Sequence, residues 1–356
     1  MCALSSIFCP VTDPFDCAAA ERVLPHAPVD EGQIVKGIEP TTRLPFGVSR
    51  YYAALARTED PQSDPIAAQF VPTSGEQVVL PYESADPIGD TRHLVTSRLV
   101  HHYPDRALLL VSDRCATYCR FCFRRHFTGN GGGRISEAQL EEACDYLSRT
   151  AGVKEILLSG GDPLMLSDQD LRLVIHRLLQ VDAAYILRIC TRMPVVLPSR
   201  VTEDLARMLG SFGSVWVVVH ANHPRELTEE FRRGIRLLLA AGVPALNQSV
   251  LLRGVNDDAD TLEQLFRGLV RFGVKPYYLF QGDLASGTAH FRVPMQHGIA
   301  LMEELRRRLS GLALPTYAVD LPGGGKVPVE SSLLRTEPDA FVLRGPDGGE
   351  HRYPRE

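Results

Sequence analysis

The sequence predicts an α/β fold, a partial (β/α)6 barrel, and three observations lead to this prediction. From about residue 106, apolar runs rich in β-branched residues alternate with amphipathic stretches, a pattern typical of βαβ units around a parallel sheet. Six such units are too few to close the eight-stranded form of the barrel. The segments richest in Cys, Gly, His and Asp follow the predicted strands, which is where such barrels carry their active sites.

The chain divides into three predicted parts. Residues 1–100 form an N-terminal extension, mostly helical but partly irregular, with short helices near 16–23 and 49–56. Residues 101–312 form the barrel, and residues 313–356 add a lysine-bearing loop and a β-hairpin. The barrel strands are predicted at 107–113, 154–160, 185–191, 214–220, 245–252 and 275–281, and its helices near 136–149, 168–180, 200–211, 226–241, 259–272 and 295–309.

Helix starts are visible in the same stretch. Ser136 and Gln139 have the S-x-x-Q spacing of a capping box, in which each side chain satisfies a backbone N–H of the other residue. After residue 310 the alternation of strands and helices ends. A strand, a glycine-rich turn and a second extended piece follow, and the tail after about residue 340 has the pattern of a β-hairpin.

Composition excludes several classes of function. A chain of 356 residues with 44% hydrophobic residues and a net charge of −5 has no electrostatic signature of nucleic-acid or membrane-surface binding. Apolar runs stay short of the ~20 residues of a membrane span, and the N-terminus lacks the pattern of a signal peptide. The cysteines outside the run described next form no disulfide-like framework, so a reduced, cytoplasmic location is expected.

The strongest motif is a run of three cysteines directly after the first barrel strand. Cys115, Cys119 and Cys122 form C-x3-C-x2-C, and thiolates are ligands of iron–sulfur clusters. Electron-carrying clusters usually have four cysteine ligands, so a run of three leaves one iron of a [4Fe–4S] cluster open to a ligand. A zinc site is the alternative, but zinc ribbons carry a second ligand pair at a distance, which this sequence lacks. Three structural cysteines are the remaining alternative.

A glycine turn and a lysine loop accompany the cysteines. Ser159-Gly160-Gly161-Asp162 follows the second strand, and paired glycines permit close backbone approach to a ligand, although a tight strand-to-helix turn has the same pattern. Lys326, one of only four lysines, ends a PGGGK loop. Its functional interpretation is a Schiff-base lysine for an aldehyde cofactor such as pyridoxal phosphate (PLP), and a surface lysine is the alternative.

Several charged residues are candidates for substrate contacts. Arg124 and Arg125 follow the cysteine run, and a planar guanidinium grips a carboxylate well. Arg106 enters the first strand and could meet a phosphate. Asp283 and Asp320 lie on two late loops, and would hold a cationic group if they faced one cavity, although loop aspartates are more often caps or turn residues.

Taken together, these segments resemble a known family. CATYCRFC, LLSGGDP, LLRGVND, QGDLASGTAHF and VDLPGGGK are similar to motifs of the radical SAM lysine 2,3-aminomutase family, and PFGVSRYYAAL and HHYPDRALLLVSD extend the likeness over residues 40–345. The resemblance implies a radical SAM barrel with a [4Fe–4S] cluster, S-adenosyl-L-methionine (SAM) and PLP as cofactors.

The resemblance also implies a role for each candidate residue. Cys115, Cys119 and Cys122 would bind the cluster, and Ser159, Gly160, Gly161, Asp162 and His220 would contact SAM. Lys326 would bind PLP covalently, with Arg106 and Gln248 near its phosphate. Arg124 would take the substrate carboxylate, and Asp283 and Asp320 the distal cation.

Three departures from the family's lysine enzymes stand out. Those enzymes generally have one more glycine before the lysine and a cysteine where Gly282 stands. They also continue into a C-terminal extension with zinc-binding cysteines at a subunit contact, whose partner position is Asp258 here. A homo-oligomer is therefore expected to be a dimer rather than a zinc-linked tetramer.

The expected activity is an amino acid 2,3-aminomutase acting on a free basic L-α-amino acid, with lysine favoured. Breaking a β C–H bond is beyond any side-chain base, so a radical route is required. Two carboxylates in one pocket favour a cation over glutamate or alanine. Arginine is the first alternative substrate and a lysine of a partner protein the second. An electron donor such as flavodoxin or ferredoxin would be the partner, and a cluster-bearing binding or electron-transfer protein is the alternative from another class.

Overall fold

A computed structural model describes residues 30–37, 44–130, 132–323 and 325–355 of the chain. The helix predicted near 16–23 and the cysteines Cys2, Cys9 and Cys17 lie outside these ranges. Six strands pair side by side in parallel and match the predicted ones to within two residues. They are β4 (Arg106–Ser112), β5 (Glu155–Gly160), β6 (Ile186–Thr191), β7 (Val215–Val219), β8 (Ala245–Val250) and β9 (Lys275–Phe280).

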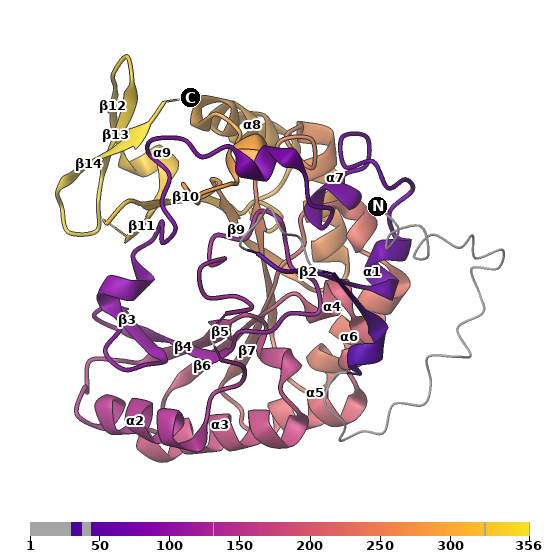
Figure 1. Cartoon of the computed structure of the whole chain (residues 1–356), viewed down its shortest axis with the longest axis vertical. Helices are drawn as coiled ribbons and strands as arrows, with labels where there is room; N and C mark the ends of the chain where they lie inside the picture. Colours follow the sequence, from indigo (N-terminus) through magenta and orange to yellow (C-terminus); the bar gives the residue numbers. More distant parts are fainter. Residues whose placement is uncertain (1–29, 38–43, 131, 324, 356) are drawn as a thin grey trace.

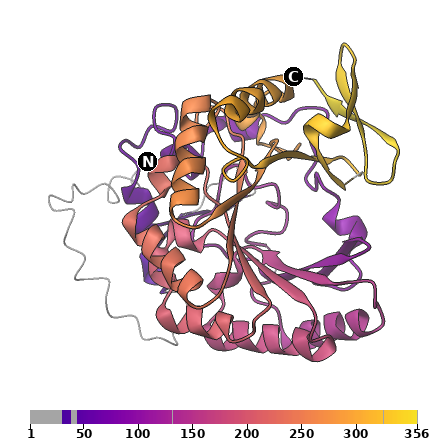
Figure 2. The same cartoon turned by 180° about the vertical axis from the view of Figure 1, so that it is seen from behind.

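Helices follow these strands and cover the outer side of the curved sheet (Figures 1 and 2). They are α2 (Glu137–Ser148), α3 (Asp168–Val181), α4 (Met193–Val196), α5 (Glu203–Gly210), α6 (Glu229–Ala240), α7 (Ala259–Arg271) and α8 (Met295–Arg308). The predicted capping box starts α2, with Ser136 Oγ accepting from Gln139 N at 3.2 Å and Gln139 Oε1 from Ser136 N at 3.0 Å. The partial barrel is confirmed. In the described ranges, none of the helices is long and apolar enough to cross a bilayer.

The sheet continues beyond the six predicted strands. Within the described residues it has nine strands, because β3 (Leu99–Tyr103) pairs antiparallel with β4, β10 (Thr316–Leu321) pairs parallel with β9, and β11 (Gly325–Pro328) pairs antiparallel with β10. Strands β10 and β11, assigned by sequence to the C-terminal part, therefore hydrogen-bond into the barrel sheet. Lys326 lies on its last strand.

The remaining C-terminal residues form a small sheet of their own, which projects from the barrel (Figure 1). After α9 (Val329–Ser332), strands β12 (Leu333–Thr336), β13 (Ala340–Arg344) and β14 (Glu350–Pro354) pair in antiparallel order. The predicted hairpin is β13–β14, and β12 adds a strand that the sequence did not reveal.

The N-terminal extension is less helical than predicted. In its described part, β1 (Ile34–Gly37) pairs with β2 (Phe46–Ser49), and α1 (Arg50–Ala54) is the one α-helix; four short 3-10 turns span Glu31–Gln33, Ala67–Gln69, Ser74–Gln77 and Asp90–His93. Aspartates explain part of this difference, because a side chain such as Asp64 accepts from Ile66 N and Ala67 N and stabilises turns in place of a longer helix. The extension packs against the cysteine loop, where Gly47 O accepts from Tyr118 N and Gln69 O from Arg120 N.

Candidate active site

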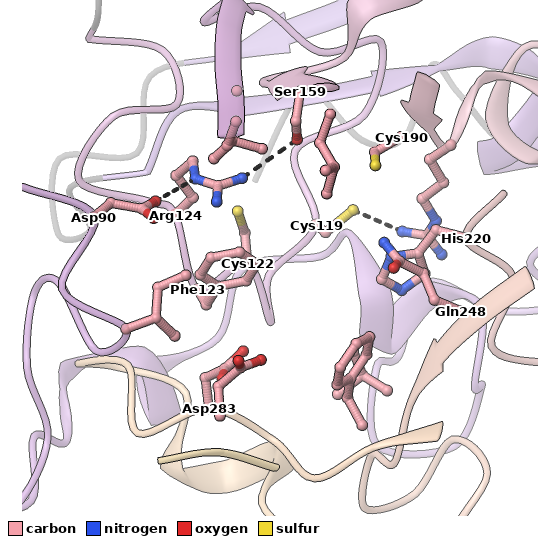
Figure 3. Close-up of a pocket in the computed structure, with 18 of the residues that line it drawn as sticks. Asp90, Cys119, Cys122, Phe123, Arg124, Ser159, Cys190, His220, Gln248 and Asp283 are labelled. Atoms are coloured by element: carbon pink, nitrogen blue, oxygen red, sulfur yellow. Dashed lines mark hydrogen bonds and ion pairs between the residues drawn. The ribbon is translucent and has the colours of Figure 1, made fainter. Parts of the chain in front are cut away.

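One cavity of about 410 Å³ (Figure 3) extends from the loops at the carboxyl ends of the parallel strands, the expected active-site end of such a barrel, into the barrel interior, where Arg106 and Glu155 at the amino ends of β4 and β5 also line it. Every residue to which the family resemblance gives a role lines it. These residues are Arg106, Cys115, Cys119, Cys122, Arg124, Ser159, Gly160, Gly161, Asp162, His220, Gln248, Asp283, Asp320 and Lys326.

The three cysteines lie on the loop after β4 and are free thiols. Burial raises the pKa of Cys115 and of Cys122, so as unliganded groups they favour the neutral thiol. A bound metal reverses this preference, because coordination holds thiols in the thiolate form. Three free thiols converging on one cavity, in a loop fixed at both ends, fit the ligand set of a cluster.

Glu76 of the N-terminal extension fixes the cysteine loop through two arginines. Glu76 is fully buried and accepts from Arg120 Nε at 2.8 Å, Arg120 Nη2 at 2.7 Å and Arg125 Nη2 at 2.9 Å. Arg125 therefore supports the loop and does not line the cavity. Of the two arginines after the cysteines, only Arg124 remains a candidate for binding substrate.

The glycine turn packs on the backbone that leads into Cys115. Gly161 N donates to Ser112 O at 2.6 Å and Asp162 N to Arg114 O at 2.8 Å. A Cβ on Gly160, whose φ is +110°, would lie 2.4 Å from Ser112 O, and one on Gly161 would lie 2.4 Å from Arg114 O. Both positions therefore require glycine, because their backbone lies against the start of the cysteine loop.

Asp162 has a supporting role within this turn. Its carboxylate accepts from Leu164 N at 2.9 Å, Thr191 Oγ1 at 2.7 Å and Arg192 N at 2.8 Å. Burial raises its pKa, while these hydrogen bonds oppose that rise. The side chain joins the turns after β5 and β6, so its effect on a ligand is exerted through the backbone that it orients.

His220 follows β7 and lines the cavity with a free ring nitrogen. Burial, reinforced by the charge of Arg192, lowers the pKa of His220 to about 3, so the imidazole is neutral. Its Nε2 is buried and has no hydrogen-bond partner among the described residues. A buried ring nitrogen without a partner is costly unless a ligand supplies one.

Arg124 is fixed beside the cysteines by two bonds. Its Nε donates to Asp90 Oδ2 at 2.7 Å and its Nη1 to Ser159 Oγ at 3.3 Å, as the dashed lines in Figure 3 show. Because the guanidinium is buried and held in one orientation, it is suited to bind an anion in the cavity.

Lys326 and Asp320 face each other across the β10–β11 hairpin. They are direct cross-strand partners, with Lys326 Nζ 4.0 Å from Asp320 Oδ2. The ammonium lies 4.5 Å from the ring centroid of Phe280 and 5.2 Å from that of Tyr278. The Lys326 backbone N donates to Tyr103 Oη at 2.8 Å, which ties this strand to β3.

Asp283 adds a second carboxylate to the same end of the cavity. Burial, and then the charge of Asp320, raise the pKa of Asp283 to about 8. Arg292 Nη2 lies near but donates to the backbone oxygen of Asp283 at 3.4 Å, and its ion pair is with Glu83. The Asp283 carboxyl group is thus proton-bearing at neutral pH until a cation arrives.

Arg106 and Gln248 lie on the walls of the cavity. Arg106 stacks over the Tyr103 ring at 3.9 Å and pairs with Asp105 at 2.9 Å, at the entrance of β4. Gln248 lies on β8 and is half-buried. Both are positioned to contact a ligand that occupies the cavity.

Sequence reasoning missed several residues of this wall. Arg192 lies beside Cys119, and Cys190, Tyr103, Tyr278 and Phe280 also line the cavity. Cys190, which its strand position alone would place in the core, lies on β6 and points into the cavity (Figure 3). Strand alternation could have found it, because Leu187 and Ile189 take the opposite face.

A curved parallel sheet with three cysteines on the loop after its first parallel strand defines a class, the radical SAM enzymes. Residues 109–265 match the family model described as the Radical SAM superfamily, so a [4Fe–4S] cluster and SAM are implied. The chain is 42% identical over 307 residues to the L-lysine 2,3-aminomutase of Clostridium subterminale, covering 86% of this chain and 74% of that one. It is 41% identical to the L-lysine 2,3-aminomutase of Acetoanaerobium sticklandii (92% and 79% covered) and 36% identical to the glutamate 2,3-aminomutase of Clostridioides difficile (86% and 72% covered). The chain belongs to the lysine 2,3-aminomutase family of radical SAM enzymes.

Proposed function

We propose that this chain is a 2,3-aminomutase that moves the α-amino group of a free basic L-amino acid, L-lysine in the first place, to the β carbon. The observation that carries the proposal is the pair Asp283 and Asp320 beside Lys326 in the cavity that the three cysteines line. When bound, the cluster with SAM would supply a carbon radical that takes a β hydrogen, and PLP, transferred from Lys326 to the substrate amine, would carry the migrating amino group.

The cysteine end of the cavity supports cluster and SAM binding. Cys115, Cys119 and Cys122 would hold the cluster, leaving one iron for SAM. The free Nε2 of His220 offers a buried hydrogen-bonding position on the wall, and the backbone of Gly160 and Gly161 lines the same side. These groups would bind SAM and hold it in one orientation.

The opposite end supports PLP binding. Lys326 is held by its backbone bond to Tyr103, and the faces of Tyr278 and Phe280 flank its ammonium group with apolar surface. Arg106 stands at the same wall as a cation suited to a phosphate, and Gln248 lies across the cavity as a further polar contact.

The charges of the cavity residues favour a basic amino acid over glutamate as the substrate. Arg124 would bind the substrate carboxylate, and Asp283 with Asp320 would bind the distal cation. Glutamate would bring a third carboxylate to that pair, which the raised pKa of Asp283 makes unfavourable. Arginine is the second candidate, since a guanidinium can bridge two carboxylates in fork geometry. A lysine of a partner protein is disfavoured, because a pair of half-buried aspartates inside the cavity suits the side chain of a free amino acid.

The test is anaerobic incubation of the reconstituted protein with SAM, PLP, a reductant and one of L-lysine, L-arginine or L-glutamate. The proposal expects a β-amino acid of unchanged mass from lysine, identified by NMR. A flavodoxin or ferredoxin should replace the chemical reductant. Turnover of glutamate but of neither basic amino acid would contradict the proposal. Product only from arginine would make arginine, the second candidate, the assigned substrate.

We further propose that the chain forms a homodimer and acts in the cytoplasm.

A further inference from the structure

Arg192 is a buried arginine that contacts one cysteine of the proposed cluster. It follows β6 in the TRMP turn, and its Nη1 donates to Cys119 Sγ at 2.8 Å, the bond drawn as a dashed line at Cys119 in Figure 3. Among the hydrogen bonds of the described residues, this is the one from a charged side chain to a sulfur of the three cysteines.

The second terminal nitrogen of the guanidinium, Nη2, contacts three side-chain oxygen atoms. Arg192 Nη2 donates to Glu226 Oε1 at 2.7 Å, to Tyr52 Oη at 2.9 Å and to the side-chain oxygen of Gln69. Glu226 is fully buried. Tyr52 lies on α1 and Gln69 on a 3-10 turn of the N-terminal extension, so two distant parts of the chain fix one arginine against Cys119.

Glu226 is held as firmly as the arginine. Its Oε2 accepts from the backbone N of Asn222 and of His223, and its Oε1 also accepts from Tyr52 Oη. The carboxylate therefore remains charged and cannot turn toward the sulfur. Once a cluster holds Cys119 as a thiolate, negative, positive and negative groups follow one another from Cys119 through Arg192 to Glu226.

These charges change the free energy of adding an electron to a cluster that Cys119 binds. Reduction adds one electron to the 2+ cluster to give the 1+ form, and no bond forms or breaks in that step. Hydrogen bonds to the sulfurs and nearby charge set the potential of the couple. A donated N–H and a positive charge stabilise the more negative, reduced form, and a buried carboxylate opposes them.

We propose that Arg192 is a positioning residue that raises the reduction potential of the cluster through Cys119, and that Glu226 limits that rise. Tyr52 and Gln69 keep the guanidinium in place, which gives the N-terminal extension a part in the redox chemistry. This inference rests on the cluster assignment made under the proposed function.

The test is an anaerobic titration of the full-length protein with titanium(III) citrate, a one-electron reductant, in the absence of SAM, followed by EPR of the reduced cluster. We expect Arg192→Gln to lower the equilibrium constant for reduction about tenfold, a shift of about 59 mV to more negative potential for one electron. Glu226→Gln should shift the potential in the opposite direction. Tyr52→Phe keeps all charges and should shift it by less than either variant.

Iron and sulfide analysis distinguishes a failure of this inference from a failure of the cluster assignment on which it rests. A wild-type chain without a four-iron cluster would overturn both. A wild-type cluster together with an unchanged potential in Arg192→Gln would overturn the inference alone, as would shifts of the same sign in Arg192→Gln and Glu226→Gln. If Arg192→Gln does not retain iron, two other variants test the inference. A more positive potential in Glu226→Gln and a small negative shift in Arg192→Lys support it. Unchanged potentials in those two variants overturn it.

Discussion

The two ends of the cavity treat charge differently. At the cysteine end each arginine discussed has an internal partner: Arg120 and Arg125 pair with Glu76, and Arg192 with Glu226. At the lysine end, Asp320 lies 4.0 Å from Lys326, and Asp283 is a second carboxyl group whose pKa burial and the charge of Asp320 raise. A site whose charges are balanced within the protein is ready before ligands bind, whereas the lysine end requires a cation from its ligand.

The largest effect should come from Lys326, the proposed attachment site of PLP. Lys326→Ala should lower activity by ~10³-fold or more, the scale seen when a covalent catalytic group is removed. Cluster content should not change, because Lys326 lies on β11 and not on the cysteine loop after β4. Borohydride reduction with PLP, followed by peptide mapping, should label Lys326 in the wild type. The exposed Lys154→Ala is the matched control, and label on any other lysine would contradict the assignment.

Removal of one carboxylate should give the next largest effect. Asp283→Asn or Asp320→Asn should raise KM for L-lysine roughly 30-fold, since truncating one side of a buried charge pair costs about 2 kcal/mol or more. Iron content and the EPR signal should stay at wild-type values. Asp145→Asn, an exposed change on α2, serves as the control. Unchanged KM in both variants would remove the aspartates from substrate binding.

A smaller effect is expected from pH. Because the pKa of Asp283 is raised to about 8, its carboxyl group is protonated at pH 7 in the free protein. A cationic side chain binds the charged form, so lysine binding should release about one proton at pH 7 and progressively less as pH rises through 8. Affinity should increase up to tenfold per pH unit below 8 and level off above it, until the substrate ammonium titrates near ~10.4.

Calorimetry in buffers of different ionisation enthalpy measures that proton release. Asp283→Asn removes the titrating group, and its binding should release no proton from this source. Equal proton release in the wild type and Asp283→Asn would show that another group titrates.

The sequence predicted most of the barrel strands and the residues of the cavity, but not how the side chains of those residues pair. Periodicity located β4 to β9 and their helices, and strand ends located the cavity, because parallel strands bring their carboxyl ends to one edge. Asp320 and Lys326 were both nominated, but their direct pairing depends on the register of β10 and β11, which a glycine-rich turn does not specify.

Long-range partners were the part that could not be predicted. Arg192 meets Tyr52 across 140 residues and Cys119 across 73, and no local pattern encodes such a pairing. Glu76, which holds the cysteine loop through Arg120, lies in an extension whose irregular turns give no periodic signal. In the described part of that extension, the predicted helical character was the main error, because side-chain-capped turns such as the one at Asp64 replace longer helices.

The smallest predicted effect tests how rigid the cysteine end must be. Gly161→Ala would bring a Cβ to 2.4 Å from Arg114 O, so the turn must move away from the strand that leads into Cys115. The overpacking should cost about 1–3 kcal/mol of stability, measured by thermal unfolding, together with a partial loss of bound iron. Gly311→Ala, where an added Cβ meets nothing within 4 Å, should leave both unchanged. If Gly161→Ala kept full iron and wild-type stability, the contact of the glycine turn with the cysteine loop would have no supporting role, and preorganisation at this end would depend on the arginine pairs alone.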